Sequence, residues 1–327
     1  MYFVVNPSLD PYFNIAAEEH LLKYLDREIV SLYCNSSSVI VGKHQNTLAE
    51  INAPYVLKNN IPVVRRISGG GTVFHDLGNI NFTFIRRIDP KKMVNFQVHT
   101  QPVVDFLQSK GVDAHIGGKN DIRVEGIKIS GNAQHIFRDK VLHHGTLLYN
   151  TNLKALTEAL EVNNNRMFAD KAIKSIRSNV INIASLLNYQ LPLDTFTSEL
   201  KNHLFACFPQ MEEYHLSDQD IELIEKLKKE KYNRWEWNFG YSPEYVYRNC
   251  SLIKECPISI ELKVKNGVCN SVLITVNNKI LYSNHPLIIG LVGLQHKPDS
   301  IDNLLYEHNF LNYRDMGEKW DLLGLFF

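Results

Sequence analysis

The chain has 327 residues, enough for one large domain and one small domain. Lys plus Arg and Asp plus Glu each total 35, so the formal net charge at pH 7 is zero. This balance argues against bulk electrostatic binding to nucleic acid, which needs a basic face. The longest apolar run, residues 286–294, is too short to cross a bilayer and is broken by glycine, so no membrane span is expected.

Cysteine usage indicates a reducing compartment. The five cysteines are Cys34, Cys207, Cys250, Cys256 and Cys269, and none belongs to a C-x-x-C pair. An odd number of cysteines in a chain too large to need disulfide staples predicts free thiols and a cytoplasmic location. The N-terminus lacks a basic region followed by a long apolar run, so we expect no signal peptide. For the oligomeric state we take a monomer as the default.

The N-terminal part predicts short strands around one long helix. The expected strands are at residues 2–5, 29–33 and 39–41. Residues 14–25 carry apolar side chains on one side and predict an amphipathic helix, with Glu18 and Glu19 directed toward another side. Either Asn14 or Asp10 is expected to cap this helix, because both side chains can accept hydrogen bonds from its first turn.

A glycine-rich segment follows. Residues 61–67 are rich in β-branched side chains and residues 80–85 alternate, which predicts strand, tight turn and strand around Gly69-Gly70-Gly71. Residues without a Cβ allow positive φ and close approach of a ligand, and their exposed N–H groups can bind an anion. A plain hairpin turn is the simpler interpretation of such glycines. The Arg-Arg pair before the turn and the His-Asp pair after it favour an anion site.

A lysine in a second hairpin is the next candidate. Residues 122–124 and 127–129 predict a β-hairpin that turns at Glu125-Gly126. Side chains alternate across a strand, so Lys128 points away from the isoleucines on either side of it. Lysine is also common on exposed edge strands, where it prevents aggregation. The small residues S-G-N-A that follow Lys128 leave room for a ligand beside it.

The remaining elements predict an α+β fold, because strands and helices do not alternate as in a doubly wound sheet. The expected helices are at residues 55–59, 93–110, 153–160, 196–208, 217–231, 301–307 and 316–325. The other expected strands are at residues 112–116, 141–149, 258–265 and 271–276, the last two forming a hairpin around Asn266-Gly267. Gly111 is expected to end the helix before it. Residues 161–170 predict a loop, and the lysine-rich end of the 217–231 helix predicts a solvated face.

Two further patterns bear on the site and on the domains. His143 and His144 are adjacent in a strand, so only one of them can face a given pocket. No His/Cys spacing typical of a structural zinc site is present. Trp235, Trp237 and Phe239 alternate and are expected to pack the boundary between two domains, with Pro243 marking the linker. We therefore expect domains at residues 1–240 and 241–327.

The motifs R-R-I-S-G-G-G-T-V-F-H-D-L-G-N, G-K-N-D-I and K-I-S-G-N-A resemble those of the lipoate–protein ligases. The resemblance extends, in order and spacing, from near the N-terminus to about residue 240. The supporting motifs are N-I-A-A-E-E (14–19), V-I-V-G-K-H-Q-N (39–46), H-H-G-T-L-L (143–148), S-I-R-S-N-V (175–180) and W-E-W-N-F-G (235–240). The last part of the chain resembles the small accessory domain of two-domain ligases, without a distinctive motif.

The resemblance implies a mixed-sheet catalytic domain of the biotin/lipoate ligase type with a small α+β C-terminal accessory domain. It implies ATP-dependent activation of lipoate to lipoyl-AMP, with Mg²⁺, and transfer of the lipoyl group to a lysine of a lipoyl domain. The implied partners are lipoyl domains of 2-oxoacid dehydrogenase complexes, the glycine cleavage carrier protein, or both. Whether lipoate or octanoate is preferred does not follow from the sequence.

The resemblance also assigns residues. Lys128 is the expected catalytic residue, because a cation between a carboxylate and the α-phosphate stabilises both. Asp121 is the expected Mg²⁺ ligand, since this hard cation prefers oxygen. The residues expected at the nucleotide are Arg66, Gly71, Thr72, Val73, Phe74 and Lys128. The residues expected at lipoate are Arg66, Gly70, His75, Lys128 and His144.

Rival functions remain open from the sequence. An octanoyl transferase of the same superfamily would need a cysteine nucleophile near the lysine, yet no cysteine lies between Cys34 and Cys207. A biotin ligase would carry a glycine loop resembling G-R-G-R-x-G, which is absent here. A non-catalytic lipoate-binding homologue would not need Lys128, Asp121 and Arg66 together. A lipoyltransferase that uses preformed lipoyl-AMP would retain most of these residues.

Overall fold

A computed structural model describes residues 1–88, 95–118, 120–162, 166–253, 255–316 and 319–327. The chain forms two compact units that are discontinuous in sequence. The first consists of Met1–Lys43, Pro62–Thr157 and Ser175–Arg234, and the second of His44–Ile61, Glu158–Lys174 and Trp235–Phe327. The second unit therefore includes three stretches of the expected 1–240 domain, namely residues 44–61, 158–174 and 235–240. In the described part of the chain, every helix is too short or too polar to span a bilayer.

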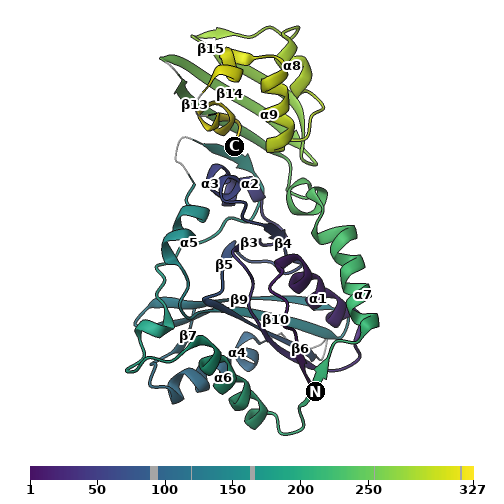
Figure 1. The fold of residues 1–327 in the computed structure, drawn as a ribbon, viewed down its shortest axis with the longest axis vertical. Helices are drawn as coiled ribbons and strands as arrows, with labels where there is room; N and C mark the ends of the chain where they lie inside the picture. Colours follow the sequence, from purple (N-terminus) through teal and green to yellow (C-terminus); the bar gives the residue numbers. More distant parts are fainter. Residues whose placement is uncertain (89–94, 119, 163–165, 254, 317–318) are drawn as a thin grey trace. The chain divides into compact units, whose positions relative to one another are not determined.

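An eight-stranded mixed sheet forms the centre of the first unit, in the order β12-β1-β2-β6-β10-β9-β8-β7. Figure 1 labels its strands β6, β7, β9 and β10. Its strands are β1 (Tyr2–Val5), β2 (Ile29–Tyr33), β6 (Asn79–Arg87), β7 (His115–Gly117), β8 (Asp121–Val124), β9 (Ile127–Phe137), β10 (Lys140–Leu148) and β12 (Glu212–His215). The β12–β1 and β1–β2 pairs are parallel and the other pairs are antiparallel. This arrangement confirms the predicted mixed-sheet α+β class.

The two faces of this sheet differ because β6 alternates apolar and polar side chains. Ile80, Phe82 and Phe84 point into the hydrophobic core with α4 and α6, and Asn81 and Thr83 are left on the opposite face. The helix α1 contacts β6 and β10, and in Figure 1 it lies on the side of the sheet opposite α4 and α6.

The helices of this unit and its border are α1 (Pro11–Tyr24), α4 (Phe96–Ser109), α5 (Leu153–Leu160), α6 (Leu193–Cys207) and α7 (Asp218–Leu227). The first two residues of the predicted 93–110 helix lie outside the described residues.

A second, three-stranded sheet carries the glycine segment, in the order β4-β3-β5. Its strands are β3 (Ser38–Val41), β4 (Val63–Arg65) and β5 (Val73–His75). The predicted pairing of residues 61–67 with 80–85 is therefore wrong. Strand β3 lies between β4 and β5, parallel to the first and antiparallel to the second, and residues 80–85 belong to β6 in the large sheet. The glycines connect two strands that do not pair with each other.

The helix α1 begins at Pro11, with Asp10 as its cap, because the Asp10 Oδ1 accepts the Tyr12 N–H at 2.9 Å. Both glutamates of this helix are buried, at 3% exposure for Glu18 and 2% for Glu19. Helical periodicity places them apart from the apolar residues, but it does not show what packs against them. Their burial depends on partners from distant segments, such as His144 for Glu18 and Lys231 for Glu19.

The lysine-rich run at the end of α7 is only partly the solvated face that the sequence predicts, because Lys226, Lys229 and Glu230 are exposed while Lys228 and Lys231 are half-buried. A π-helical turn, Lys228–Tyr232, continues the helix. The Lys231 Nζ donates to the buried Glu19 Oε2 at 2.6 Å, and the Lys228 Nζ donates to Asp10 at 3.0 Å. These ion pairs fasten the end of α7 to α1.

The second unit is built on a five-stranded sheet in the order β11-β13-β14-β15-β16. Its strands are β11 (Met167–Asp170), β13 (Tyr245–Ile253), β14 (Cys256–Lys265), β15 (Val268–Val276) and β16 (Lys279–Ile280). The hairpin around Asn266-Gly267 is confirmed, with φ values of 51° and 73° at the two turn residues. The loop predicted at 161–170 is wrong for its last four residues, which form β11 and pair with β13.

The helices of the second unit are α2 (Thr47–Glu50), α3 (Ala53–Lys58), α8 (Pro286–Leu291), α9 (Pro298–Glu307) and α10 (Trp320–Leu323). The alternating aromatics belong to this unit and are not extended, since Glu236–Gly240 forms a π-helical turn. One turn apart, Trp235 stacks on Phe239 with ring centroids 6.4 Å apart. The aromatic residues alternate in the sequence as they would in a strand, yet Trp235 and Phe239 also lie one helical turn apart.

The core between α4, α6 and the sheet should determine the stability of the first unit. Phe196 is fully buried. Its ring centroid lies 5.1 Å from that of Phe106 and 4.5 Å from that of Tyr149. We expect Phe196→Ala to lower the free energy of unfolding by about 3–5 kcal/mol, because it leaves a cavity. Urea unfolding measures this change. Thr195→Ala in the same helix is the exposed control, and equal losses in the two variants would contradict this account of the core.

Candidate active site

The loop between β4 and β5 is held by a buried arginine. The Arg66 guanidinium donates to the carbonyl oxygens of Gly69 at 2.6 Å and Gly71 at 2.8 Å, on either side of Gly70. It also donates to the Ile40 carbonyl at 3.0 Å and to the Ser68 hydroxyl at 2.9 Å. Of the three glycines, only Gly70 has positive φ, at 88°. Arg66 therefore fixes the loop conformation from beneath.

The S-I-R-S-N-V segment (175–180) packs against this loop through its first residue, Ser175. The Ser175 Oγ accepts the Thr72 N–H at 2.9 Å. A Cβ on Gly71 would lie 2.9 Å from the same oxygen, so a larger residue there would displace the segment. Glycine is required at Gly71 for close approach, and at Gly70 for backbone conformation.

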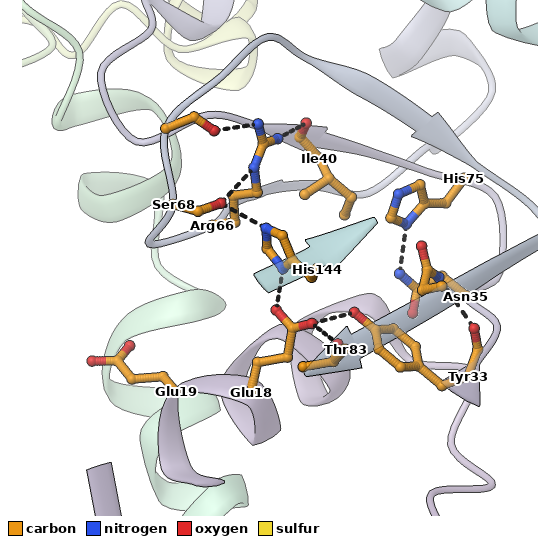
Figure 2. Close-up of polar contacts among 12 residues, drawn as sticks. Glu18, Glu19, Tyr33, Asn35, Ile40, Arg66, Ser68, His75, Thr83 and His144 are labelled. Atoms are coloured by element: carbon orange, nitrogen blue, oxygen red, sulfur yellow. Dashed lines mark hydrogen bonds and ion pairs between the residues drawn. The ribbon is translucent and has the colours of Figure 1, made fainter. Parts of the chain in front are cut away.

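Below the loop lies a buried chain of polar side chains, drawn in Figure 2. The Ser68 Oγ is 2.6 Å from the His144 Nε2, and the His144 Nδ1 is 2.7 Å from the Glu18 Oε2. The other Glu18 oxygen accepts the hydroxyls of Thr83 at 2.5 Å and Tyr33 at 3.0 Å. These residues come from α1, β2, β6, β10 and the glycine loop, so one carboxylate connects all of them.

The charges in this chain compensate one another. Burial alone raises the pKa of Glu18, but the charge and hydrogen bond of His144 and the two hydroxyl donors together bring it below the ordinary value of 4.5. Burial lowers the pKa of Arg66 to about 10, against the opposing effect of Glu18 and Tyr33. Arg66 is still protonated at neutral pH, and Glu18 is ionised.

His75 lies in the same region and is uncharged. Its Nδ1 is 2.9 Å from the Asn35 Nδ2, and the side chain is buried. Burial, followed by the nearby charges of Arg66 and His144, lowers the pKa of His75 to about 3. His143 points to the other face of β10, where it contacts Gln134 and Phe82. The two adjacent histidines therefore point to opposite faces of β10, and His144 is the one that lies beside Glu18 and Ser68.

Lys128 lies in β9 beside an acidic partner. Its Nζ is 2.9 Å from the Asp121 Oδ1, and the Arg123 Nη2 is 2.8 Å from the Asp121 Oδ2. The predicted hairpin at Glu125-Gly126 is confirmed, and a bulge between Ile122 and Arg123 shifts the register. A Cβ on Gly131 would lie 2.9 Å from the Lys128 Nζ, so this glycine provides space for the ammonium group.

The glycine loop lies near the strand of Lys128. A Cβ added at Gly70 would be 3.8 Å from the Ala133 Cβ, and Ala133 is in the same strand as Lys128. The segment that begins at Ser175 also runs beside Lys128. The Lys128 N–H donates to the Asn179 carbonyl at 3.0 Å, and the Lys128 carbonyl accepts the Ile181 N–H at 3.2 Å. Gly70, Gly71, Arg66 and His144 thus form one hydrogen-bonded or packed group, and Lys128 with Asp121 forms a second group.

The remaining predicted residues lie in or beside β5. Thr72 contacts Ser175, and Val73 and Phe74 pair with Ile40 and Val39 of β3. Because β5 is an edge strand, alternate backbone groups point away from β3 and face outward. Lys119 of the G-K-N-D-I motif lies outside the described residues.

A resident metal ion does not fit the predicted ligand by itself. Both Asp121 oxygens contact cationic side chains. Among the described residues, no group of three or more His, Cys, Asp or Glu side chains could hold a metal ion. One carboxylate fits a Mg²⁺ ion that arrives already bound to phosphates, which is the usual way this ion binds nucleotide enzymes.

Comparison with known proteins agrees with this geometry. A sequence model of the family described as "Lipoyl protein ligase A/B catalytic domain" matches residues 10–205. Lipoate-protein ligase LplJ of Bacillus subtilis is 38% identical over 332 residues, covering 100% of both chains. Lipoate–protein ligase 1 of Staphylococcus aureus is 39% identical over 328 residues, covering 99% of both chains.

The chain belongs to the lipoate–protein ligase family. The predicted family and the enzyme class are thus confirmed.

Solved structures extend the likeness to the fold of this ligase. A putative lipoate protein ligase from T. acidophilum with bound lipoic acid has a TM-score of 0.63 at 25% identity, covering 73% of this chain and 98% of that one. A lipoate-protein ligase A bound with ATP has a TM-score of 0.63 at 26% identity, and again covers 73% of this chain and 98% of that one. The P. falciparum protein LipL1, in complex with lipoate, shares the fold over 99% of both chains, with a TM-score of 0.62 at 22% identity.

Sequence reasoning missed several polar residues of the site, namely Glu18, Tyr33, Asn35, Ser68 and Thr83. Glu18 belongs to the quoted N-I-A-A-E-E motif, so a signal for it was present. Of the others, Tyr33 and Thr83 lie in strands, Asn35 follows β2, and Ser68 precedes the glycines. Their common role becomes apparent only when β2, β6 and α1 meet.

Cys34 is a poor nucleophile in this structure. Burial, followed by the charges of Asp194 and Asp76, raises the pKa of its thiol to about 11. At neutral pH only about one such thiol in ten thousand is ionised, and the thiolate is the reactive form. This observation disfavours a cysteine-dependent acyl transferase.

The buried carboxylate gives the ligase a specific dependence on pH. Because the pKa of Glu18 is lower in the folded than in the unfolded chain, its ionised form stabilises the fold above about pH 4.5, and this contribution is lost as the pH falls through the lowered value. We expect Glu18→Gln to lower the free energy of unfolding at pH 7 by about 3 kcal/mol, since it removes the buried carboxylate that accepts hydrogen bonds from His144, Thr83 and Tyr33. The difference from the wild type should shrink below about pH 4.

Urea unfolding at several pH values measures this effect. Glu222→Gln, on the exposed side of α7, is the matched control and should change little. A loss that is independent of pH, or no loss at all, would show that the Glu18 charge does not stabilise the site.

Proposed function

We propose that this ligase activates free lipoate with ATP to form lipoyl-AMP and then transfers the lipoyl group to a lysine of a lipoyl domain. The observation that carries the proposal is the arrangement of Lys128, paired with Asp121, in the strand that passes beside the glycine loop. Among similar structures of at least 25% identity, one has lipoic acid bound and another has ATP bound. Both substrates would therefore meet in the first unit.

In the first half-reaction, a carboxylate oxygen forms a bond to the α-phosphorus and the bond to pyrophosphate breaks. The carboxylate and the phosphate repel each other, so a cation between them lowers the barrier. The Lys128 ammonium is the group we assign to this role. In the second half-reaction, the target amine attacks the acyl carbon, loses a proton, and AMP leaves.

The glycine loop is our proposed nucleotide site. Backbone groups of Gly71, Val73 and Phe74 lie on or beside the edge strand β5, where a ligand can reach them. The Thr72 N–H donates to Ser175, and this bond holds Thr72 in place beside the proposed nucleotide site. Arg66 would act mainly by holding the loop, because its hydrogen bonds are to Gly69, Gly71, Ser68 and Ile40.

For the acyl end we assign Gly70, His75 and His144, with Lys128 at the carboxyl group. Mg²⁺ would enter bound to ATP, with Asp121 as its only proposed carboxylate ligand, and it would neutralise phosphate charge.

Lipoyl domains of 2-oxoacid dehydrogenases or the glycine cleavage carrier are the proposed protein substrates. One similar archaeal structure is titled as a bi-partite lipoate protein ligase and its E2 lipoyl domain. All five cysteines are free thiols, which suits the proposed cytoplasmic location. A monomer would be sufficient, since the proposed residues all come from one chain.

The assay for this function measures pyrophosphate release with Mg·ATP and lipoate, and with octanoate and biotin in parallel. We expect release with lipoate, followed by a gain in mass of an added lipoyl domain that matches one lipoyl group. A gain in mass only when lipoyl-AMP is supplied would instead establish a transferase that does not activate lipoate. A gain only from an octanoyl thioester carrier would establish an octanoyl transferase.

Lys128→Ala should reduce pyrophosphate release at least a hundredfold, since one preorganised electrostatic contact to developing charge contributes about that much. Lys263→Ala is the matched control. Lys263 also lies between two apolar residues of a β-strand, but in the second unit and exposed. Normal turnover by Lys128→Ala would remove this lysine from the mechanism.

Asp121→Asn separates two roles of this carboxylate. If Asp121 only orients Lys128, we expect the kcat for pyrophosphate release to fall about tenfold, with an unchanged dependence on Mg²⁺. If it also binds Mg²⁺, half-maximal activity should need a higher Mg²⁺ concentration. The measurement is a Mg²⁺ titration at saturating ATP, and wild-type values in both parameters would contradict both roles.

A further inference from the structure

His75 has an unsatisfied polar atom in the interior of the first unit. Its side chain is 97% buried, yet its Nε2 has no hydrogen-bond partner among the described residues. Buried polar atoms are nearly always paired, so an unpaired one at a binding site calls for a missing partner. Whether this atom is a donor or an acceptor depends on which ring nitrogen carries the proton.

The answer begins at Asn14 in α1. Its Nδ2 lies 2.8 Å from the Ser8 carbonyl oxygen and 3.2 Å from that of Cys34. Carbonyl oxygens only accept hydrogen bonds, so the side-chain atom facing them must be the amide nitrogen. Its Oδ1 then accepts from the Asn6 Nδ2 at 2.8 Å. Backbone atoms therefore determine the orientation of the Asn14 amide.

This orientation is transmitted to the histidine. The Asn14 Nδ2 donates to the Asn35 Oδ1 at 2.7 Å, so the other end of the fully buried Asn35 amide is a donor. That donor, the Nδ2, lies 2.9 Å from the His75 Nδ1 (Figure 2). The His75 Nδ1 must therefore accept, and the proton of the neutral ring is on Nε2. The unpaired atom is an N–H donor.

We infer that the His75 Nε2–H donates a hydrogen bond to an acceptor atom of the bound substrate, and that Asn35, oriented by Asn14, is the positioning residue that keeps it a donor. The inference rests on the proposed function for the identity of the substrate, the acid or the nucleotide. It goes further in naming the atom, the tautomer and two residues outside the site predicted from sequence.

The environment suits a neutral donor. With a pKa of about 3, His75 stays uncharged across the physiological range, so the hydrogen bond does not vary with pH. The nearby positive charge of Arg66, one cause of that low pKa, also favours an electron-rich acceptor at this place. A ring free to change its tautomer would present an acceptor for part of the time and would then repel such an atom. The amide chain prevents this change.

The first experiment reads the tautomer and the ligand directly in the wild-type protein. Long-range ¹H–¹⁵N spectra, assigned with His75→Gln, distinguish a protonated Nε2 from a protonated Nδ1. We expect Nε2–H in the free protein and a shift of its resonance on adding octanoate or lipoate. A shift with lipoate alone would assign the acceptor to the dithiolane sulfur, and a shift with ATP alone would assign it to the nucleotide.

The second experiment reverses the hydrogen bond. In Asn35→Asp, the atom facing His75 becomes an acceptor, so the neutral ring places its proton on Nδ1 and presents a bare Nε2. We expect the tautomer signal to change and the KM of the affected substrate to rise about tenfold or more, since one hydrogen bond is lost and two acceptors then face each other. Asn182→Asp is the control. The Asn182 amide also accepts one hydrogen bond and donates another, but both are to the backbone of Thr151 and neither is to a histidine.

Three outcomes would overturn the inference. They are an Nδ1–H tautomer in the wild type, no shift with lipoate, octanoate or ATP at saturation, or an unchanged KM in Asn35→Asp after the tautomer has switched. If Asn35→Asp does not fold, the two wild-type measurements still decide. Failure of the proposed function is distinguishable, because it would appear as absent pyrophosphate release by the wild type, whatever the tautomer.

Discussion

The Glu18 carboxylate is the constraint on which the proposed active site depends. It is buried beneath the glycine loop and bonds His144, Thr83 and Tyr33 from three strands. Through His144 and Ser68 it is connected to Arg66, whose guanidinium holds the loop carbonyls. An ionised carboxylate in the interior is costly unless it is paired, so these elements can pack only in an arrangement that satisfies it.

The two groups of site residues are positioned by different means. The glycine loop is determined from below by hydrogen bonds to Arg66, and from the side by Ser175. Lys128 is determined by Asp121 and by the same 175–181 segment, which bonds its backbone. One irregular segment thus sets the distance between the loop and the lysine. Its sequence, S-I-R-S-N-V, carries no charge pattern that would reveal this role without the fold.

Much of the local structure was predictable, because it follows from short-range rules. The hairpins at Glu125-Gly126 and Asn266-Gly267 occur where glycine permits positive φ, and the helix cap at Asp10 follows from side-chain chemistry. The errors concern long-range partners. The strand predicted after the glycines belongs to another sheet, and Lys231 bonds the buried Glu19 instead of facing solvent. Neither partner is close in sequence.

By itself, the sequence determined the family, the mixed α+β class and the candidate residues Lys128, Arg66 and His144, because ordered motifs and alternation are local properties of the chain. Only the tertiary structure decided which polar groups share a buried environment. That Glu18 stays ionised and that Asn35 keeps a proton on the His75 Nε2 both depend on atoms brought together from distant segments. Charge state and tautomer are set by surroundings, and surroundings exist only in the folded chain.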